Sequence, residues 1–190
     1  MRIIRNWLVA TETILMLTLV GVGAAAPAVA DPGMGSQDTA SASADDTAEG
    51  GLPNGQRLSP FDLSSPAVNR LDPALLDAIQ RATQSAADDG ITIGLTSGWR
   101  SPEFQQRLYD EAVVQYGSPD IASQYVASPQ VSKHVIGKAV DVGPAAADDW
   151  LIRNGLAFGL CQIYANEIWH FELASDYGSV CPPLRPNAAG

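Results

Sequence analysis

The residues best suited to chemistry in this chain cluster around its two histidines. His134 and His170 are the only histidines among 190 residues. His134 is followed by Asp141 within the segment S-K-H-V-I-G-K-A-V-D. His170 lies in the segment E-I-W-H-F-E, between Glu167 and Glu172. Imidazole and carboxylate groups at such short spacing can bind a metal ion or transfer protons.

Two imidazoles and one carboxylate satisfy the requirements of a catalytic zinc site. Such a site takes three nitrogen or oxygen ligands from the protein and leaves a fourth position for water. Zinc lowers the pKa of that water to about 7, so a nearby carboxylate can take its proton. We therefore predict that His134, Asp141 and His170 bind one Zn²⁺ per chain. Glu167 is then the candidate catalytic base.

The local sequence indicates how these groups would be presented. Gly137 would allow a tight turn between the first histidine and its aspartate. A regular strand would put Glu167 and His170 on opposite faces, so a bend or turn is required between them. His170 and Glu172 would share a face of an extended segment. We therefore expect Glu172 to orient the imidazole of His170.

Apolar periodicity and capping signals predict an α+β domain over residues 56–181. Helices are expected from Asp72 to Gly90, from Ser101 to Gly117, from Ser118 to about Ala127 and from Ala145 to Asn154. Strands are expected over 91–95, 137–143, 160–164 and 168–173, and the last two are compatible with a hairpin turning at 165–166. Because helices come first and strands later, we expect helices packed on a small, mostly antiparallel sheet in a single domain.

The flanking segments differ in composition from this domain. Residues 1–30 carry Arg2 and Arg5, an apolar run over 14–26 and a small-residue site over 28–30, which together predict a cleaved signal peptide. The alternative is an uncleaved membrane anchor, but the run is short for a hydrocarbon core of about 30 Å. We therefore expect no stable membrane insertion after signal cleavage. Residues 31–55 predict a disordered acidic linker, and 182–190 a proline-containing tail.

Charge and cysteine content narrow the possible partners and environment. The formal net charge of −10 argues against nucleic acid and anionic lipid surfaces, since both are bound by basic patches. Cys161 and Cys181 are the only cysteines, and in an exported chain such a pair predicts a disulfide. The alternative is a nucleophilic Cys161 with His170 as its base, which competes with the use of that histidine as a ligand.

Three motifs in this order resemble those of the VanY-like zinc D-alanyl-D-alanine carboxypeptidases, which act on bacterial peptidoglycan. The first is S-G-W-R-S over 97–101, with a glutamine downstream. The second is S-x-H-x-x-G-x-A-x-D over 132–141, and the third is E-x-W-H over 167–170. The resemblance covers roughly residues 70–175. Any one motif alone would be weak, but the three together are specific.

The resemblance implies the same zinc ligands and base, and it adds roles for further residues. Arg100 matches an arginine that stabilises the developing oxyanion, a role that suits the fixed N–H groups and permanent charge of a guanidinium. Ser132 and Gln105 match positions that hold the substrate peptide. Trp99 and Trp169 are expected to be packing walls of the substrate cleft rather than direct contacts.

The implied function is that of a secreted or cell-envelope-associated, monomeric zinc metallopeptidase. It would remove the terminal D-alanine from a peptidoglycan stem peptide. An L,D-carboxypeptidase, a peptidoglycan endopeptidase of the same fold and an inactive zinc-containing cell-wall binding module are the alternatives. A serine enzyme would need S-x-x-K, and this motif precedes neither of the two lysines.

Two departures from the family pattern concern substrate choice. Ile168 follows the predicted base where many members have proline. Cys161 and Cys181 bracket the third motif, which is not general in the family. A disulfide at this place would pin the strand that carries Glu167 and His170. These differences leave the predicted metal and reaction type unchanged.

Overall fold

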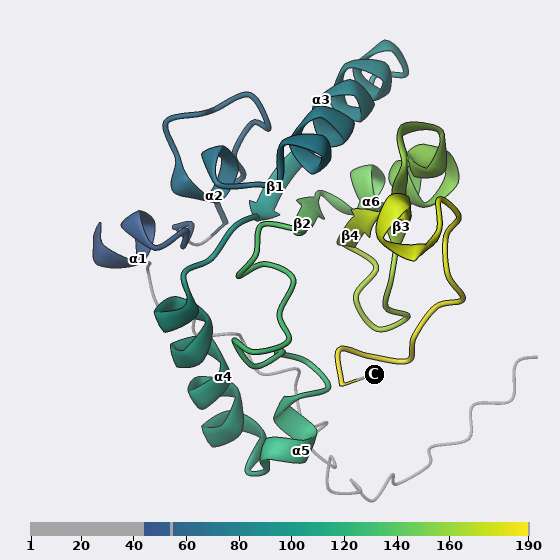
Figure 1. The fold of residues 1–190 in the computed structure, drawn as a ribbon. Coiled ribbons are helices and arrows are strands. Elements are labelled where there is room, and N and C mark those ends of the chain that lie inside the picture. The colour runs from purple at the N-terminus through teal and green to yellow at the C-terminus, as the bar shows by residue number, and fades with distance from the viewer. Residues whose placement is uncertain (1–43, 54, 190) are drawn as a thin grey trace, which may run out of the picture. The chain divides into compact units, whose positions relative to one another are not determined.

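The domain consists of one antiparallel sheet with helices around it (Figure 1). The computed structural model describes residues 44–53 and 55–189. Four strands, β1 Gly94–Ser97, β2 Ala139–Gly143, β3 Leu160–Gln162 and β4 His170–Leu173, pair in the order β1-β2-β4-β3. All three strand pairs are antiparallel. The predicted α+β class with helices on a small antiparallel sheet is confirmed.

The described helices are α1 Ala44–Ala48, α2 Pro66–Asn69, α3 Pro73–Asp88, α4 Pro102–Tyr116, α5 Pro119–Ala122 and α6 Ala145–Asn154, with 3₁₀ turns η1 Gly155–Phe158 and η2 Ala174–Tyr177. Four of the described helices, α2 to α5, begin where serine or aspartate stands directly before proline. Asp72 caps α3 by accepting a hydrogen bond from the Ala74 amide, and Ser101 caps α4 by accepting one from the Phe104 amide. Such caps satisfy amides that the first helical turn leaves unpaired.

Several elements are shorter than the sequence predicts. β1 starts at Gly94 rather than Ile91, and α5 ends at Ala122 rather than near Ala127. β3 and β4 do pair, but residues 163–169 between them form a long connection instead of a two-residue hairpin turn. The reason lies in backbone pairing outside the sheet, because the Ala165 amide donates to Arg185, whose own amide donates to Ile163.

Alternation along β2 and β4 separates the core from a polar face. Val140 and Phe171 belong to the main apolar cluster, which also contains Leu75 and Ile79 of α3 and Leu151 of α6. These five side chains are at most 1% exposed. Because successive strand residues point to opposite faces, the residues between the apolar ones face away from this core.

The segments that flank the domain are only partly described. The predicted signal peptide and residues 31–43 of the predicted linker lie outside the described residues. Residues 44–53 differ from the expected disordered linker, since the buried Gly51 packs against Phe104 of α4 and the buried Gly50 packs against Trp99 and Arg100, just before α4. Among the described helices, none combines the length and apolar character needed to cross a membrane.

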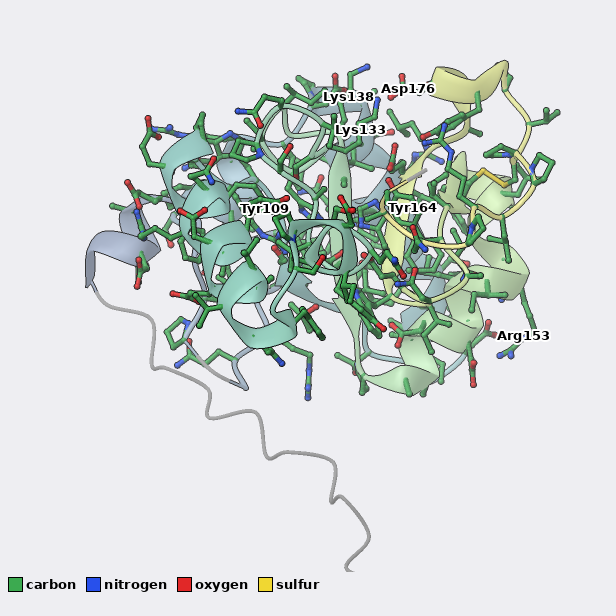
Figure 2. The ribbon with its side chains drawn as sticks, turned by 90° about the horizontal axis from the view of Figure 1, so that it is seen from below. Tyr109, Lys133, Lys138, Arg153, Tyr164 and Asp176 are labelled. Atoms are coloured by element: carbon green, nitrogen blue, oxygen red, sulfur yellow. A yellow bond between two sulfur atoms is a disulfide. The ribbon has the colours of Figure 1, made fainter. Side chains whose placement is uncertain are left out.

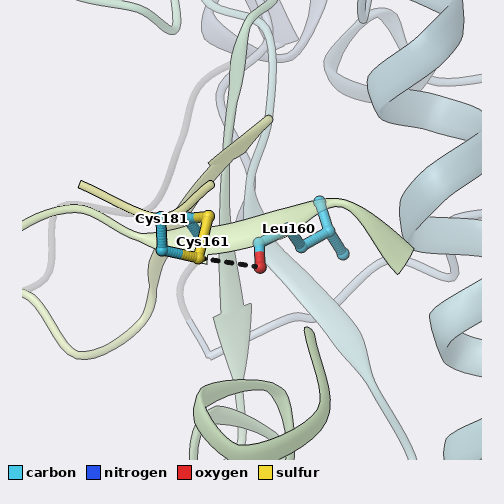
Figure 3. Close-up of a disulfide and its surroundings, with 3 residues drawn as sticks. All are labelled: Leu160, Cys161 and Cys181. Carbon is cyan, nitrogen blue, oxygen red and sulfur yellow. Dashed lines mark hydrogen bonds between the residues drawn. A yellow bond between two sulfur atoms is a disulfide. The ribbon is translucent and has the colours of Figure 1, made fainter. Parts of the chain in front are cut away.

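The C-terminal tail is attached to the domain at two places. The predicted disulfide between Cys161 and Cys181 is confirmed, with a Cα–Cα distance of 5.4 Å (Figure 3). It excludes the alternative of a nucleophilic Cys161. Arg185 then forms a parallel bridge with Tyr164. The predicted tail therefore runs along the connection that leads to the third motif.

Candidate metal centre and catalytic site

Strand register brings the second and third motifs together. Asp141 in β2 is the direct partner of His170 at the start of β4. Both residues alternate with core residues, so both lie on the face of the sheet opposite the apolar cluster. His134 arrives from the loop before β2, where Gly137 has a φ of 70°. A Cβ at Gly137 would lie 2.5 Å from the carbonyl oxygen of Arg70, so only glycine fits this turn.

His134 is oriented by the first motif. Its Nδ1 lies 2.7 Å from the carbonyl oxygen of Gly98, which can only accept a hydrogen bond. This contact places the proton on Nδ1 and leaves the lone pair on Nε2. That Nε2 atom lies 3.4 Å from Oδ1 of Asp141. Burial and the charge of Arg100 lower the pKa of His134, which favours the neutral ring that a metal requires.

His170 is oriented from the opposite side by an acidic residue. Its Nε2 lies 3.0 Å from Oε1 of Glu172, while its Nδ1 lies 3.0 Å from Oδ1 of Asp141. The hydroxyl of Tyr177 donates to Oε2 of Glu172 at 2.8 Å. The ring of Tyr164 packs beside the imidazole, with ring centroids 4.9 Å apart. The predicted shared face of His170 and Glu172 is therefore present, and Glu172 is completely buried.

The three predicted ligands fit a divalent metal ion. His134, Asp141 and His170 each offer one ligand atom, and these atoms lie within 4.8 Å of one another. All three side chains are buried. Each imidazole also has an acceptor behind it, a carbonyl in one case and a carboxylate in the other, as is usual for metal-binding histidines. The donor set of two imidazoles and one carboxylate is typical of zinc sites that retain an open position.

The protonation of these groups reflects their close packing. Burial opposes ionisation of Asp141, but the two imidazoles beside it, His134 and His170, hold its pKa well below the ordinary value. Burial lowers the pKa of His170, but hydrogen bonds to Asp141 and Glu172 outweigh it and raise the pKa to about 9. A metal ion must therefore displace a proton from His170 at neutral pH.

Glu167 lies at the edge of the same cluster with one oxygen unpaired. Its Oε2 is 3.9 Å from Nδ1 of His170, and the His170 amide donates to the Glu167 carbonyl at 3.1 Å. This turn supplies the bend that the three-residue spacing requires. Oε1 of Glu167 is buried without a hydrogen-bond partner among the described residues. Burial raises its pKa to about 7, so this carboxyl can exchange a proton near neutral pH.

Arg100 is held by three partners at this site. Its Nε donates to Ser97 at 2.8 Å, one terminal nitrogen donates to Gln105 at 3.0 Å, and the other donates to Oδ2 of Asp141 at 3.0 Å. Gln105 is 1% exposed, and its amide nitrogen donates to the Ala127 carbonyl at 2.7 Å. In this arrangement Gln105 orients Arg100, whereas the resemblance implied a contact with substrate.

The remaining predicted site residues lie around this centre. Ser132 is buried two residues before the first histidine. Trp99 packs under the guanidinium of Arg70 and donates to the Val135 carbonyl at 3.1 Å, which fits the expected packing role. Trp169 is 41% exposed. An ion pair between Lys138 and Asp176 at 3.0 Å ties the second motif to η2, as Figure 2 shows.

Two contributors were missed by sequence reasoning. Tyr177 follows β4 in η2, and Tyr164 lies in the connection before the third motif (labelled in Figure 2). Neither belongs to a spacing pattern with the histidines, because both reach the site through the path of the chain after it leaves the sheet.

Comparison with known proteins assigns the family. A family model described as VanY, D-alanyl-D-alanine carboxypeptidase, matches residues 68–177. The chain belongs to the VanY family. A D-alanyl-D-alanine carboxypeptidase of Enterococcus faecalis (strain ATCC 700802 / V583) is 28% identical over 127 residues. That match covers 54% of this chain and 47% of the relative, so the chain spans about half the length of the curated relative it matches.

Two solved structures of VanY proteins share the fold. One is a vancomycin-resistance D,D-pentapeptidase VanY from a VanB-type cassette in complex with Zn(II), with 26% identity and a TM-score of 0.53. The match covers 57% of this chain and 75% of that one. The other is VanYB in complex with D-alanine-D-alanine, with 25% identity, a TM-score of 0.53, and coverage of 57% of this chain and 74% of that one.

Proposed function

We propose that this VanY-family chain is a zinc metallopeptidase that removes the terminal D-alanine from peptidoglycan stem peptides. The observation that carries the proposal is the convergence of His134, Asp141 and His170 within 4.8 Å, with an unpaired buried oxygen of Glu167 beside them. The zinc complex of a related VanY protein supports the choice of metal, and the D-alanine-D-alanine complex supports the substrate class.

Glu167 and Arg100 have different roles in the proposed hydrolysis. A bound zinc ion would polarise the scissile carbonyl and lower the pKa of an attacking water. Glu167 accepts the proton of that water and later gives it to the leaving amine of D-alanine. Its pKa of about 7 suits both transfers. Three of the five N–H groups of Arg100 are used by protein acceptors, which leaves two for negative charge that develops on the substrate oxygen.

The electrostatics of the site favour this division. Asp141 stays ionised because its pKa is held low, so the ligand carboxylate does not compete with Glu167 for protons. Arg100 is anchored to Asp141 at 3.0 Å, so its positive charge stays fixed close to the ligand cluster. A fixed charge stabilises a developing oxyanion without the cost of reorienting the side chain during the reaction.

The proposed location is outside the cytoplasm. The acidic chain with its N-terminal export pattern suits a peptidoglycan substrate, and we propose that the mature protein acts as a monomer, secreted or associated with the cell envelope. Mass spectrometry of the protein recovered from culture would show a new N-terminus after residue 30 if the signal is cleaved as proposed.

The decisive experiment measures D-alanine release from a synthetic pentapeptide that ends in D-alanyl-D-alanine. The zinc-loaded protein should release D-alanine, a chelator should abolish release, and β-lactams should leave it unchanged. Glu167→Gln should retain zinc but lose at least about 10³-fold in kcat. Release from a tetrapeptide only, or cleavage only of cross-linked dimers, would replace the D,D-assignment with an L,D-carboxypeptidase or an endopeptidase. No cleavage of any of the three substrates by the zinc-loaded protein would indicate a binding module.

A further inference from the structure

A segment outside the family match contacts the backbone that carries Arg100. The match to the VanY model begins at residue 68, whereas α1 and the turn that follows it lie at 44–51. The carbonyl of Glu49 accepts a hydrogen bond from the Ser101 amide at 2.8 Å. This bond holds the N-cap residue of α4, which directly follows Arg100.

Gly50 makes the closest approach in this segment. Its φ is 91°, and a Cβ built on it would lie 2.0 Å from the carbonyl oxygen of Trp99 and 3.2 Å from Cα of Arg100. No side chain can be accommodated at 2.0 Å from a backbone oxygen without a shift of one of the two chains. The Gly50 backbone therefore lies flat against the Trp99–Arg100 peptide.

Charged and aromatic contacts fix the same segment to α4. Arg107 of α4 binds Asp46 at 2.6 Å and Glu49 at 2.5 Å. Gly51 packs against the ring of Phe104, where a Cβ would lie 3.0 Å from Cζ. The Gly51 amide donates to the Asp46 carbonyl at 2.7 Å, which closes the turn after α1. The docking thus combines ion pairs, ring packing and main-chain bonds.

Arg100 is enclosed by three segments as a result. The Trp99 amide donates to the Ala67 carbonyl at 2.9 Å on one side, and the Arg100 amide donates to the His134 carbonyl at 3.3 Å on another. The third side is covered by Glu49 and Gly50. Movement of Glu49 and Gly50 would displace the backbone of Arg100. It would also displace the Gly98 carbonyl two residues earlier, which is the hydrogen-bond acceptor of His134.

We propose that residues 46–51, named here the N-terminal strap, are a positioning element for Arg100. The strap touches neither the ligand atoms nor Glu167 in any contact of the described residues, so it acts through the Trp99–Arg100 peptide. The catalytic unit of this chain therefore begins near residue 44, upstream of the segment that the family model matches. The effect on turnover rests on the proposed peptidase function, while the docking itself does not.

The test compares two glycines of the same region in the full-length, zinc-loaded protein. Gly50→Ala introduces the clash with Trp99. Gly55→Ala is the matched control, since Gly55 also has a positive φ, of 71°, but nothing lies within 4 Å of a Cβ there. We expect Gly50→Ala to lower kcat between about 10-fold and 100-fold with little change in KM or zinc content, and Gly55→Ala to change kcat less than about twofold.

A double variant separates positioning from general damage. Because the strap acts through Arg100, Gly50→Ala should lower kcat less than about threefold when introduced into Arg100→Ala. Equal losses in both backgrounds would overturn the proposal. If Gly50→Ala fails to fold, Arg107→Gln is tested in its place, and Arg107→Lys is its conservative control. The loss of kcat caused by Arg107→Gln should likewise be smaller in the Arg100→Ala background than in the wild type.

Amide hydrogen exchange tests the docking without reference to activity. The Ser101 amide should exchange at least about 10-fold faster in Gly50→Ala than in Gly55→Ala, because its acceptor Glu49 is displaced. Unchanged exchange would overturn the docking. If the wild-type protein cleaves none of the peptides, the proposed function fails, yet the exchange result still decides whether the strap holds this backbone.

Discussion

Oε1 of Glu172 lies 3.0 Å from Nε2 of His170, on the side of the imidazole away from Asp141. By accepting at Nε2 it selects the tautomer with the proton on that nitrogen, and this leaves Nδ1 to face the other two predicted ligands. Tyr177 donates to the second oxygen of Glu172, so the carboxylate itself is held in place. The orientation of one predicted ligand ring thus depends on a residue outside the predicted ligand set.

Removing this acceptor should weaken zinc binding. Glu172→Gln keeps the size of the side chain but replaces a charged acceptor by an amide, so we expect the zinc dissociation constant to rise about 10- to 100-fold. Competition with a chromophoric chelator measures it. Tyr177→Phe leaves the carboxylate in place and should have a smaller effect. If Glu172→Gln binds zinc as tightly as the wild type, the orienting role is wrong.

Zinc binding should also release a proton from His170. Its pKa of about 9 means that the ring is protonated at pH 7 in the metal-free chain, whereas a ligand must be neutral. The apparent affinity should therefore rise with pH, by about tenfold per pH unit, and level off above about pH 9. Calorimetry at pH 7 in buffers of different ionisation enthalpy should report close to one proton released for each zinc bound. A proton count near zero would contradict the prediction.

The disulfide should contribute to the stability of the domain. It closes a 20-residue separation between β3 and the C-terminal tail. In the chain-entropy model a loop of this size stabilises the fold by about 3 kcal/mol. The double variant Cys161→Ser/Cys181→Ser should lose a comparable free energy of unfolding in urea. Reducing agent should destabilise the wild type by the same amount and leave the double variant unchanged.

The sequence was a good guide wherever function depends on local pattern. The three side chains that converge at the candidate metal centre followed from residue types, and α3 and α4 followed from their capping residues and apolar periodicity. It was a poor guide where long-range pairing decides the structure. The connection over 163–169 leaves the sheet because its backbone pairs with Arg185. The expected linker is ordered at Gly50 because the backbone there packs against Trp99. No motif or residue spacing in the sequence indicates either contact.

Asp148 provides a prediction that is independent of catalysis. It lies in the first turn of α6, is 6% exposed, and its Oδ1 accepts no hydrogen bond from the described residues. Burial, together with the charges of Asp149 and Asp141, raises its pKa to about 6. Folding therefore favours the protonated form of Asp148. Once this carboxyl ionises, it lowers the free energy of unfolding.

The sign follows from the proton uptake of the two states. Between the ordinary pKa of about 3.9 and the raised value, the folded chain holds more protons than the unfolded chain. Stability contributed by this group therefore falls as pH rises from about 4 to 6 and is then constant. Asp148→Asn removes the ionisation, so it should match the wild type near pH 4 and be more stable by about 1–2 kcal/mol at pH 7.5. Urea unfolding at both pH values measures the difference, with the exposed Asp88→Asn as a control expected to change stability by less than about 0.5 kcal/mol. An equal gain at both pH values would show that the ionisation of Asp148 is not its cause.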